Sequence, residues 1–263
     1  MRLMPTAPRL FDATVVRSAQ VSPSFQRVTI TGPRLAEFEY AGFDHWFRLF
    51  IPNAVGAAMR LPTVRGRSWW APYLAIPAKE RPHYSNYTVA DFRVADGVAE
   101  MDIDVVLHAD DTGATAGGIA IWATTTTPGT PLAFLDQGRL FDPPADVTAI
   151  HVIADESGLP AARGILRSLP ADATGTVIIE VPEQGDIVEL VAPSGIRVRW
   201  IARDGSGDVP GTAALAEVQK LVPDATDYAF IVGESALATG GRRALHKAGL
   251  PKPRITFSGF WKH

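Results

Sequence analysis

A change of periodicity near residue 141 is the feature of this sequence that most constrains its fold. Before that point, runs rich in β-branched and aromatic residues are bounded by Gly, Pro, Asp and Ser, which predicts strands over residues 11–17, 25–31, 46–51, 84–92 and 101–107. The run Met101-Asp102-Ile103-Asp104-Val105 alternates apolar with charged residues, as a half-buried antiparallel strand does. With a short helix over residues 115–122 and a last strand after Pro128, this half is typical of a small antiparallel Greek-key β-barrel.

After the linker Phe141-Asp142-Pro143-Pro144, buried strands alternate with helices. Residues 147–154 and 176–181 are continuous apolar runs, and residues 160–169 have helical spacing. Further strands are expected at 196–202 and 228–232, and further helices at 213–221 and 240–248. This alternation predicts an α/β domain with a parallel sheet and helices on both faces. We therefore predict two domains, residues 1–141 and residues 142–263, the second ending in an aromatic tail.

Composition narrows the possible partners. The 263 residues are 46% hydrophobic, enough for a full core, and the net charge of -3 offers no basic surface for nucleic acid. Because the chain has no cysteine, disulfides and iron–sulfur clusters are excluded, no metal site is predicted, and electron transfer would need an organic cofactor. No apolar run reaches membrane-spanning length and the first 15 residues lack an apolar signal core, so we expect no membrane insertion and a cytoplasmic location.

A strand-to-helix turn is the clearest sign of a binding site. A buried run ends at Ala154, is followed by Asp155-Glu156-Ser157-Gly158, and leads into a helix opened by Pro160. Such turns form nucleotide sites at the carboxyl edge of a parallel sheet, although the Gly-x-Gly-x-x-Gly fingerprint is absent here. Glu180 ends the next strand. It either accepts a hydrogen bond from a ribose hydroxyl and disfavours a 2′-phosphate, which favours NADH, or is simply solvated.

Three segments, in their order and spacing, resemble the siderophore-interacting proteins, which are ferredoxin-reductase-like flavoproteins. They are Ser85-Asn86-Tyr87-Thr88, the turn from Asp155 to Ala161, and Gly259-Phe260-Trp261. The resemblance covers nearly the whole chain. It implies a two-domain ferredoxin-reductase-like fold, with an FAD-binding barrel in residues 1–141 and an NAD(P)H-binding domain in residues 142–263.

The resemblance assigns roles to the strand around Tyr87. The family pattern is Arg-x-Tyr-Thr-x-Arg, in which the tyrosine packs on the flavin, the threonine reaches its redox-active edge, and the arginines hold the pyrophosphate. Tyr87 and Thr88 are therefore the catalytic candidates, with Ser85 and Val89 beside them in the FAD-binding strand. Ser85 and Ala90 occupy the positions of the two arginines. Either Arg81 or Arg93 could reach in instead, or Tyr87 and Thr88 are ordinary strand residues.

A glycine segment resembles the family's second FAD motif, His-Gly followed by Gly-Pro-Ala. Glycines that precede a helix let backbone N–H groups approach a phosphate. The candidates in this chain are His108, Gly117, Gly118, Ile119 and Ala120. Gly118 and Ile119 replace the family's proline and alanine, and Asp110-Asp111 lengthens the approach. His108 alone also has a purely structural interpretation.

The end of the chain resembles the family's nicotinamide site and substrate rim. Gly233-Glu234 matches a Gly-Glu turn, and Gly259-Phe260-Trp261-Lys262 matches Gly-Tyr-Trp-Arg. Trp261 is a candidate to lie near the flavin, or else anchors the C-terminus. Basic candidates for an anionic ferric siderophore are Arg48, Arg139 and Lys262, with Arg65 and Arg67 as looser ones; Trp69 and Trp70 are available as apolar walls in the irregular segment 61–78.

The activity that the resemblance implies is FAD-dependent, NAD(P)H-driven reduction of a ferric siderophore by a monomeric protein. A hydride would pass from NADH or NADPH to FAD, and single electrons from FAD to Fe(III). Two alternatives remain open. One is a flavin-poor family member that binds siderophores or regulates, because Ser85 and Ala90 replace arginines; the other is a general flavin or ferric reductase.

Overall fold

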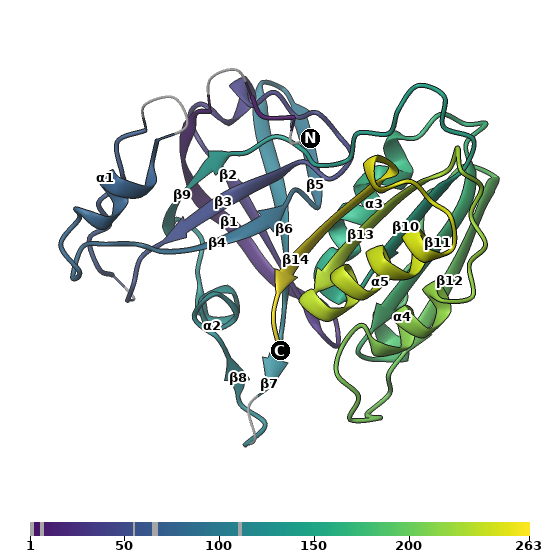
Figure 1. The fold of residues 1–263 in the computed structure, drawn as a ribbon. Coiled ribbons are helices and arrows are strands. Elements are labelled where there is room, and N and C mark those ends of the chain that lie inside the picture. Colours follow the sequence, from purple (N-terminus) through teal and green to yellow (C-terminus); the bar gives the residue numbers. More distant parts are fainter. Residues whose placement is uncertain (1–2, 6–7, 55, 65–67, 110–111) are drawn as a thin grey trace.

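The computed structural model describes residues 3–5, 8–54, 56–64, 68–109 and 112–263. It contains an antiparallel seven-stranded sheet from the first half of the chain and a parallel five-stranded sheet from the second, side by side in Figure 1. The predicted pairing of an antiparallel β-barrel with an α/β domain is confirmed. Arg65, Arg67, Asp110 and Asp111 lie outside the described residues.

The barrel sheet has the strand order β4-β3-β9-β1-β2-β6-β5. Its strands are β1 (Leu10–Ser22), β2 (Phe25–Thr31), β3 (Trp46–Ile51), β4 (His83–Thr88), β5 (Asp91–Ala95), β6 (Val98–Val106) and β9 (Pro131–Asp136). Alternate residues such as Val28, Phe47 and Ile103 point into one apolar core.

The strand predicted over residues 84–92 is two strands. After Thr88, the Val89 N–H bonds the carbonyl of His45, and the Ala90 N–H bonds that of Asp102 in β6, 2.9 Å away. The chain thus changes its pairing partner at Val89 and Ala90, both fully buried, and β5 begins at Asp91. This change joins the β4 edge of the sheet to β6 and closes the barrel.

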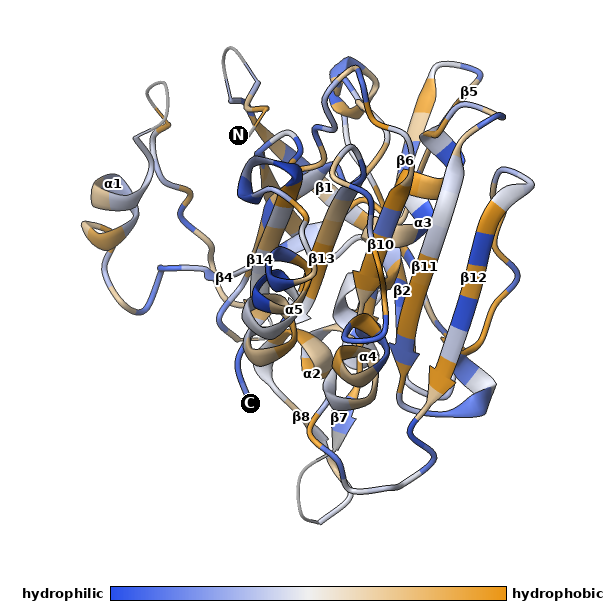
Figure 2. Ribbon diagram, turned by 45° about the vertical axis from the view of Figure 1, so that its right-hand side comes forward, coloured by the Kyte–Doolittle hydropathy of each residue, from blue (hydrophilic) through white to orange (hydrophobic). Residues whose placement is uncertain are grey.

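The parallel sheet has the order β12-β11-β10-β13-β14. Its strands are β10 (Ile150–Ala154), β11 (Thr174–Val181), β12 (Gly195–Ala202), β13 (Tyr228–Glu234) and β14 (Ile255–Trp261). Helix α3 (Leu159–Ser168) packs on the face of Val152 and Ala154, whereas α4 (Thr212–Val218) and α5 (Ser235–Lys247) pack on the face of Ile153. The central strands are apolar, and β12 alternates along the sheet edge (Figure 2).

The end of the chain differs from the expected aromatic tail. Residues 255–261 form β14, an edge strand parallel to β13. Figure 1 shows that this strand runs beside the barrel, so the C-terminal aromatic residues are held by sheet hydrogen bonds. The segment 61–78 also contains a short helix that was not predicted, α1 (Trp70–Leu74).

The remaining elements are short. They are α2 (Gly118–Thr125), the hairpin β7 (His108–Ala109) with β8 (Thr115–Ala116), and the 3-10 turns Leu35–Glu37, Glu156–Gly158, Gln184–Asp186 and Lys252–Arg254. None of the helices in the described part of the chain is long and apolar enough to cross a membrane.

Helix α3 ties the parallel sheet to the barrel. Arg163 donates to the Asp104 carboxylate in β6 at 3.2 Å, and Arg167 donates to the Ala90 carbonyl at 2.7 Å. The Ser168 hydroxyl accepts from the Phe43 N–H at 2.8 Å. These contacts fix the space between the two sheets, where the candidate site lies.

Candidate functional site

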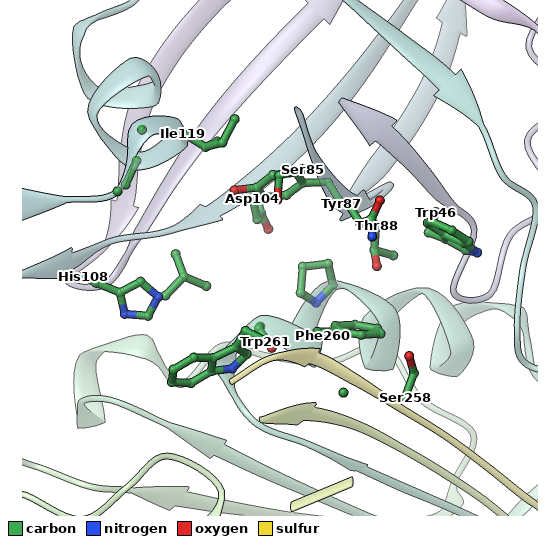
Figure 3. Close-up of a pocket in the computed structure, with 18 of the residues that line it drawn as sticks. Trp46, Ser85, Tyr87, Thr88, Asp104, His108, Ile119, Ser258, Phe260 and Trp261 are labelled. Carbon is green, nitrogen blue, oxygen red and sulfur yellow. The ribbon is translucent and has the colours of Figure 1, made fainter. Parts of the chain in front are cut away.

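A cavity of about 600 Å³ opens between the barrel and the parallel sheet. Figure 3 shows Ser85, Tyr87 and Thr88 of β4 on one side of it, and Ser258, Phe260 and Trp261 of β14 on the other. This volume is typical of pockets for small molecules and cofactors. The cavity brings together Ser85, Tyr87, Thr88, His108, Gly117, Gly118, Ile119, Ala120, Ser157 and Trp261, all expected from the sequence.

The β4 wall offers an aromatic face and a hydroxyl. Tyr87 packs against the barrel core, and burial raises the pKa of its phenol, so the ring stays neutral. Thr88 follows it with only 6% of its surface exposed, and Trp46, its partner in β3, also lines the cavity. A flat aromatic cofactor could stack on such a wall. Val89, expected in the same strand, points into the barrel core instead.

The start of α2 forms a second wall. Gly117 has φ +90 and nothing within 4 Å of the position that a Cβ would occupy. The first N–H groups of a helix, those of Gly118, Ile119 and Ala120, have no acceptor within the helix, and the helix dipole favours negative charge beside them. The glycine segment therefore fits a phosphate-bearing cofactor, as the sequence indicated.

Asp155 does not face a nucleotide. It is fully buried, and its oxygens accept hydrogen bonds from the Ser157 N–H at 2.9 Å, the Ser157 hydroxyl at 2.6 Å, and Trp261 Nε1 at 3.0 Å. The Glu234 N–H is a further donor. Burial raises the pKa of Asp155, and these hydrogen bonds oppose that rise. Its expected contact with the cofactor is therefore wrong; of the turn, Ser157 reaches the cavity.

Gly158, Gly233 and Glu234 have structural roles around Asp155 and the nearby helices. A Cβ on Gly158 would lie 2.7 Å from Val232 Cγ2, so glycine lets α3 begin against the sheet. A Cβ on Gly233, which has φ +131, would lie 2.5 Å from Asp155 Cγ. The Glu234 side chain accepts from the Ala236 N–H and caps α5. None of the three lines the cavity, contrary to expectation.

Glu156 and Glu180 are also internal. Arg203 donates to both Glu156 oxygens at 2.9 and 3.0 Å and to Glu180 at 2.9 Å. Glu180 accepts in addition from the N–H groups of Gly211 and Ala214 at the start of α4. Fully buried and saturated with donors, Glu180 is neither a ribose ligand nor solvated. The expected ribose contact and the expected solvated side chain were both wrong. Glu180 therefore gives no argument for NADH over NADPH.

Trp261 combines the two roles that the sequence left open. Its indole is anchored by Asp155, and the residue also lines the cavity. Its ring lies 5.7 Å from that of His108 at an interplanar angle of 40°. Partial desolvation lowers the pKa of His108, against the field of the Asp155 carboxylate. His108 is thus an uncharged neighbour of Trp261 at neutral pH.

The basic residues expected at a substrate rim do not line the cavity. The Arg48 guanidinium stacks 3.9 Å from the Trp69 ring centroid, and the Arg139 guanidinium lies 4.4 Å from that of Phe43. Lys262 is exposed directly after β14. Arg81 bonds the Ile76 and Leu74 carbonyls, and Arg93 pairs with Asp102 and Glu100, so neither replaces the family's arginines.

Four further lining residues belong to the quoted motifs but were not named as site residues: Asn86, Pro160, Gly259 and Phe260. The sequence analysis missed the others, which are Asp44, Trp46, His83, Asp104, Val106, Ala116, Leu140 and Ser258. His83 could have been found, because side chains two apart along a strand share a face with Ser85 and Tyr87. Asp44 accepts from the Leu140 and Phe141 N–H groups, and Asp104 pairs with Arg27 and Arg163. The described lining contains no Lys or Arg.

The comparisons with known proteins match both halves of the chain. The family model for a siderophore-interacting FAD-binding domain matches residues 14–140, and that for a siderophore-interacting protein matches residues 147–263. Ferric vibriobactin reductase ViuB of Vibrio cholerae is 30% identical over 97% of this chain and 89% of its own length. The chain belongs to the siderophore-interacting protein family.

Further proteins are similar to this chain in sequence or in structure. The NADPH-dependent ferric-chelate reductase of Escherichia coli is 27% identical, over 96% of this chain and 93% of its own. A siderophore utilization protein from T. fusca has a TM-score of 0.82 at 28% identity, covering 100% of this chain and 96% of its own. Ferredoxin-NADP+ reductase from Plasmodium falciparum shares the fold alone, with a TM-score of 0.66 at 13% identity over 95% and 96% of the two chains. The ferredoxin-reductase-like fold is thereby confirmed.

Proposed function

We propose that this protein is an FAD-dependent ferric-siderophore reductase driven by NADH or NADPH. The observation that carries the proposal is the single cavity in which Tyr87 and Thr88 of the barrel face Trp261 at the carboxyl end of the parallel sheet. Both cofactors must meet at such a junction, because a hydride passes only between groups in contact. The printed activities of the vibriobactin and ferric-chelate reductases support the same chemistry.

The residues have distinct roles in this proposal. The Tyr87 ring and the Thr88 hydroxyl orient the flavin ring system, while the amides at the start of α2 hold its phosphates. Trp261, fixed by Asp155, covers the place where the nicotinamide enters. When bound, FAD accepts a hydride from the nicotinamide and passes single electrons to ferric iron. The described residues hold no cluster of three or more His, Asp or Glu suited to a metal ion. In this proposal the iron arrives with the siderophore, as substrate.

The domain assignment follows the same division. We place the FAD-binding domain in residues 1–141 and the NAD(P)H-binding domain in residues 142–263, which the separate matches to residues 14–140 and 147–263 support. At the boundary between the two domains, the Asp44 carboxylate accepts hydrogen bonds from the Leu140 and Phe141 N–H groups. We propose that the protein acts in the cytoplasm as a monomer, with a ferric siderophore as substrate.

The test is spectroscopic. Purified protein is loaded with FAD, desalted, and mixed anaerobically with NADH or NADPH; ferric siderophore is then added. We expect retained flavin absorbance that bleaches with one nucleotide and returns with the ferric siderophore but more slowly with ferric citrate. Equal rates for both iron sources would favour a general ferric reductase. A protein that neither binds nor reduces FAD would overturn the proposal in favour of the flavin-poor alternative.

A further inference from the structure

Two residues that depart from the family pattern line the same cavity. Ser85 replaces an arginine and Gly118 replaces a proline, and both line the cavity beside the start of α2. The described lining lacks any Lys or Arg, so the negative charge of a dinucleotide needs another partner. His83 and His108 are the two described lining side chains that can carry a positive charge.

His83 is placed to be that partner. It is the first residue of β4, exposed, and on the same face as Ser85 and Tyr87. Its ring atoms Cε1 and Nε2 lie 3.8 Å from the position that a Cβ on Gly118 would occupy. A side chain at 118 would therefore touch the imidazole, whereas glycine leaves it room to turn toward the helix amides.

Other cations near the cavity are already engaged. Arg27 and Arg163 both pair with Asp104, the former through a hydrogen bond of 2.7 Å. His108 pairs with Ala116 just before α2, but its ring packs at 5.7 Å from that of Trp261 and its lowered pKa disfavours a charged ring. Ser85 lies between His83 and Tyr87 on this face of β4, and all three line the cavity.

We propose that His83, together with the first amides of α2, holds a phosphate of the flavin nucleotide in place of the arginine that Ser85 replaces. The inference rests on the proposed function and concerns its cofactor site. An imidazole N–H donates to a phosphate oxygen, and the ring needs less reach than a guanidinium because β4 begins beside α2. The contact depends on phosphate and not on the flavin ring.

The experiment compares three flavins on flavin-free protein by fluorescence titration: FAD, FMN and riboflavin, which has no phosphate. We expect His83→Ala to weaken FAD and FMN about 10-fold, corresponding to about 1.4 kcal/mol, and to leave riboflavin unchanged. His83→Gln, which keeps a donor but no charge, should lose less. Adding Ser85→Arg to His83→Ala should restore FAD binding. The control is His246→Ala, whose ring bonds the Leu250 carbonyl beyond α5.

Each outcome of the titrations supports or overturns the phosphate role of His83. Unchanged FAD binding by His83→Ala, or an equal loss for riboflavin, overturns the phosphate role while the reductase function stands. If wild-type protein binds no flavin at all, the proposed function fails first and this inference with it. Melting temperatures of all variants show whether a loss comes from unfolding, in which case the His83→Gln titration decides alone.

Discussion

The indole Nε1 of Trp261 donates a hydrogen bond to Asp155 Oδ2 at 3.0 Å. The same oxygen accepts from the Glu234 N–H, and the other oxygen accepts from Ser157. One buried carboxylate therefore joins the ends of β10, β13 and β14. Because the Trp261 ring also packs at 5.7 Å from that of His108 in the barrel half, this link continues across the cavity.

Asp155→Asn should loosen Trp261. The amide NH2 would face donors that now share a carboxylate, and each buried donor left without an acceptor costs about 1–3 kcal/mol. We expect a lower free energy of unfolding in urea and a raised KM for the nicotinamide nucleotide. Ser157→Ala is the matched comparison, because it removes one donor and keeps the carboxylate. Equal losses in the two variants would contradict a special role for the Trp261 contact.

Gly233→Ala should disrupt the same link from the other side. The added Cβ would lie 2.5 Å from Asp155 Cγ, and φ +131 is unfavourable for alanine. The control, Gly249→Ala, has φ +110 with nothing within 4 Å of the added Cβ, so it carries the backbone cost alone. We expect Gly233→Ala to lower the melting temperature clearly more than Gly249→Ala does. Similar shifts would mean that Asp155 moves aside at little cost.

Arg203→Met should destabilise the protein in a pH-dependent way. Removing the arginine shared by Glu156 and Glu180 leaves two buried carboxylates without this cationic partner, at a cost of about 3–5 kcal/mol, although two amides still donate to Glu180. Burial raises the pKa of Glu156 above its unfolded value, and Arg203 opposes this rise. A raised folded pKa means that stability from this group is present at low pH and lost as pH rises. The deficit of Arg203→Met should therefore be larger at pH 7 than at pH 5.

Arg199→Met is the control for that measurement. Arg199 pairs with Glu217 at 2.7 Å, but its side chain is 58% exposed, and such surface pairs contribute about 0–1 kcal/mol. Urea unfolding at both pH values should show a small effect without the pH trend. If Arg203→Met behaves in the same way, the buried pair does not need its arginine.

The sequence predicted most of what local pattern determines. β2 (Phe25–Thr31) and β3 (Trp46–Ile51) begin and end where their periodicity does. The Tyr87 strand and the glycine segment were placed correctly in one cavity because both follow the family's spacing. The break after Thr88 was not predictable, because it depends on hydrogen bonds to His45 and Asp102.

The roles of the buried carboxylates could not be predicted from the sequence around each residue. Glu180 ends a strand, as a ribose-binding acid would, but its donors come from Arg203 and from amides 31 and 34 positions away in the chain. Likewise, β14 exists because residues 255–261 meet the open edge of β13. Both outcomes depend on long-range contacts, which composition and periodicity do not report.

Ser85→Arg should tighten FAD binding, whereas Ala90→Arg should not, although both substitutions restore residues of the family pattern. Ser85 lines the cavity, so a guanidinium there can reach phosphate beside α2, and we expect FAD to bind about 10-fold tighter. Ala90 is fully buried, and its carbonyl accepts from Arg167. An unpaired buried guanidinium costs several kcal/mol, so Ala90→Arg should lower the melting temperature without tightening FAD. A stable Ala90→Arg protein with tighter FAD binding would show that residue 90 reaches the cavity after all.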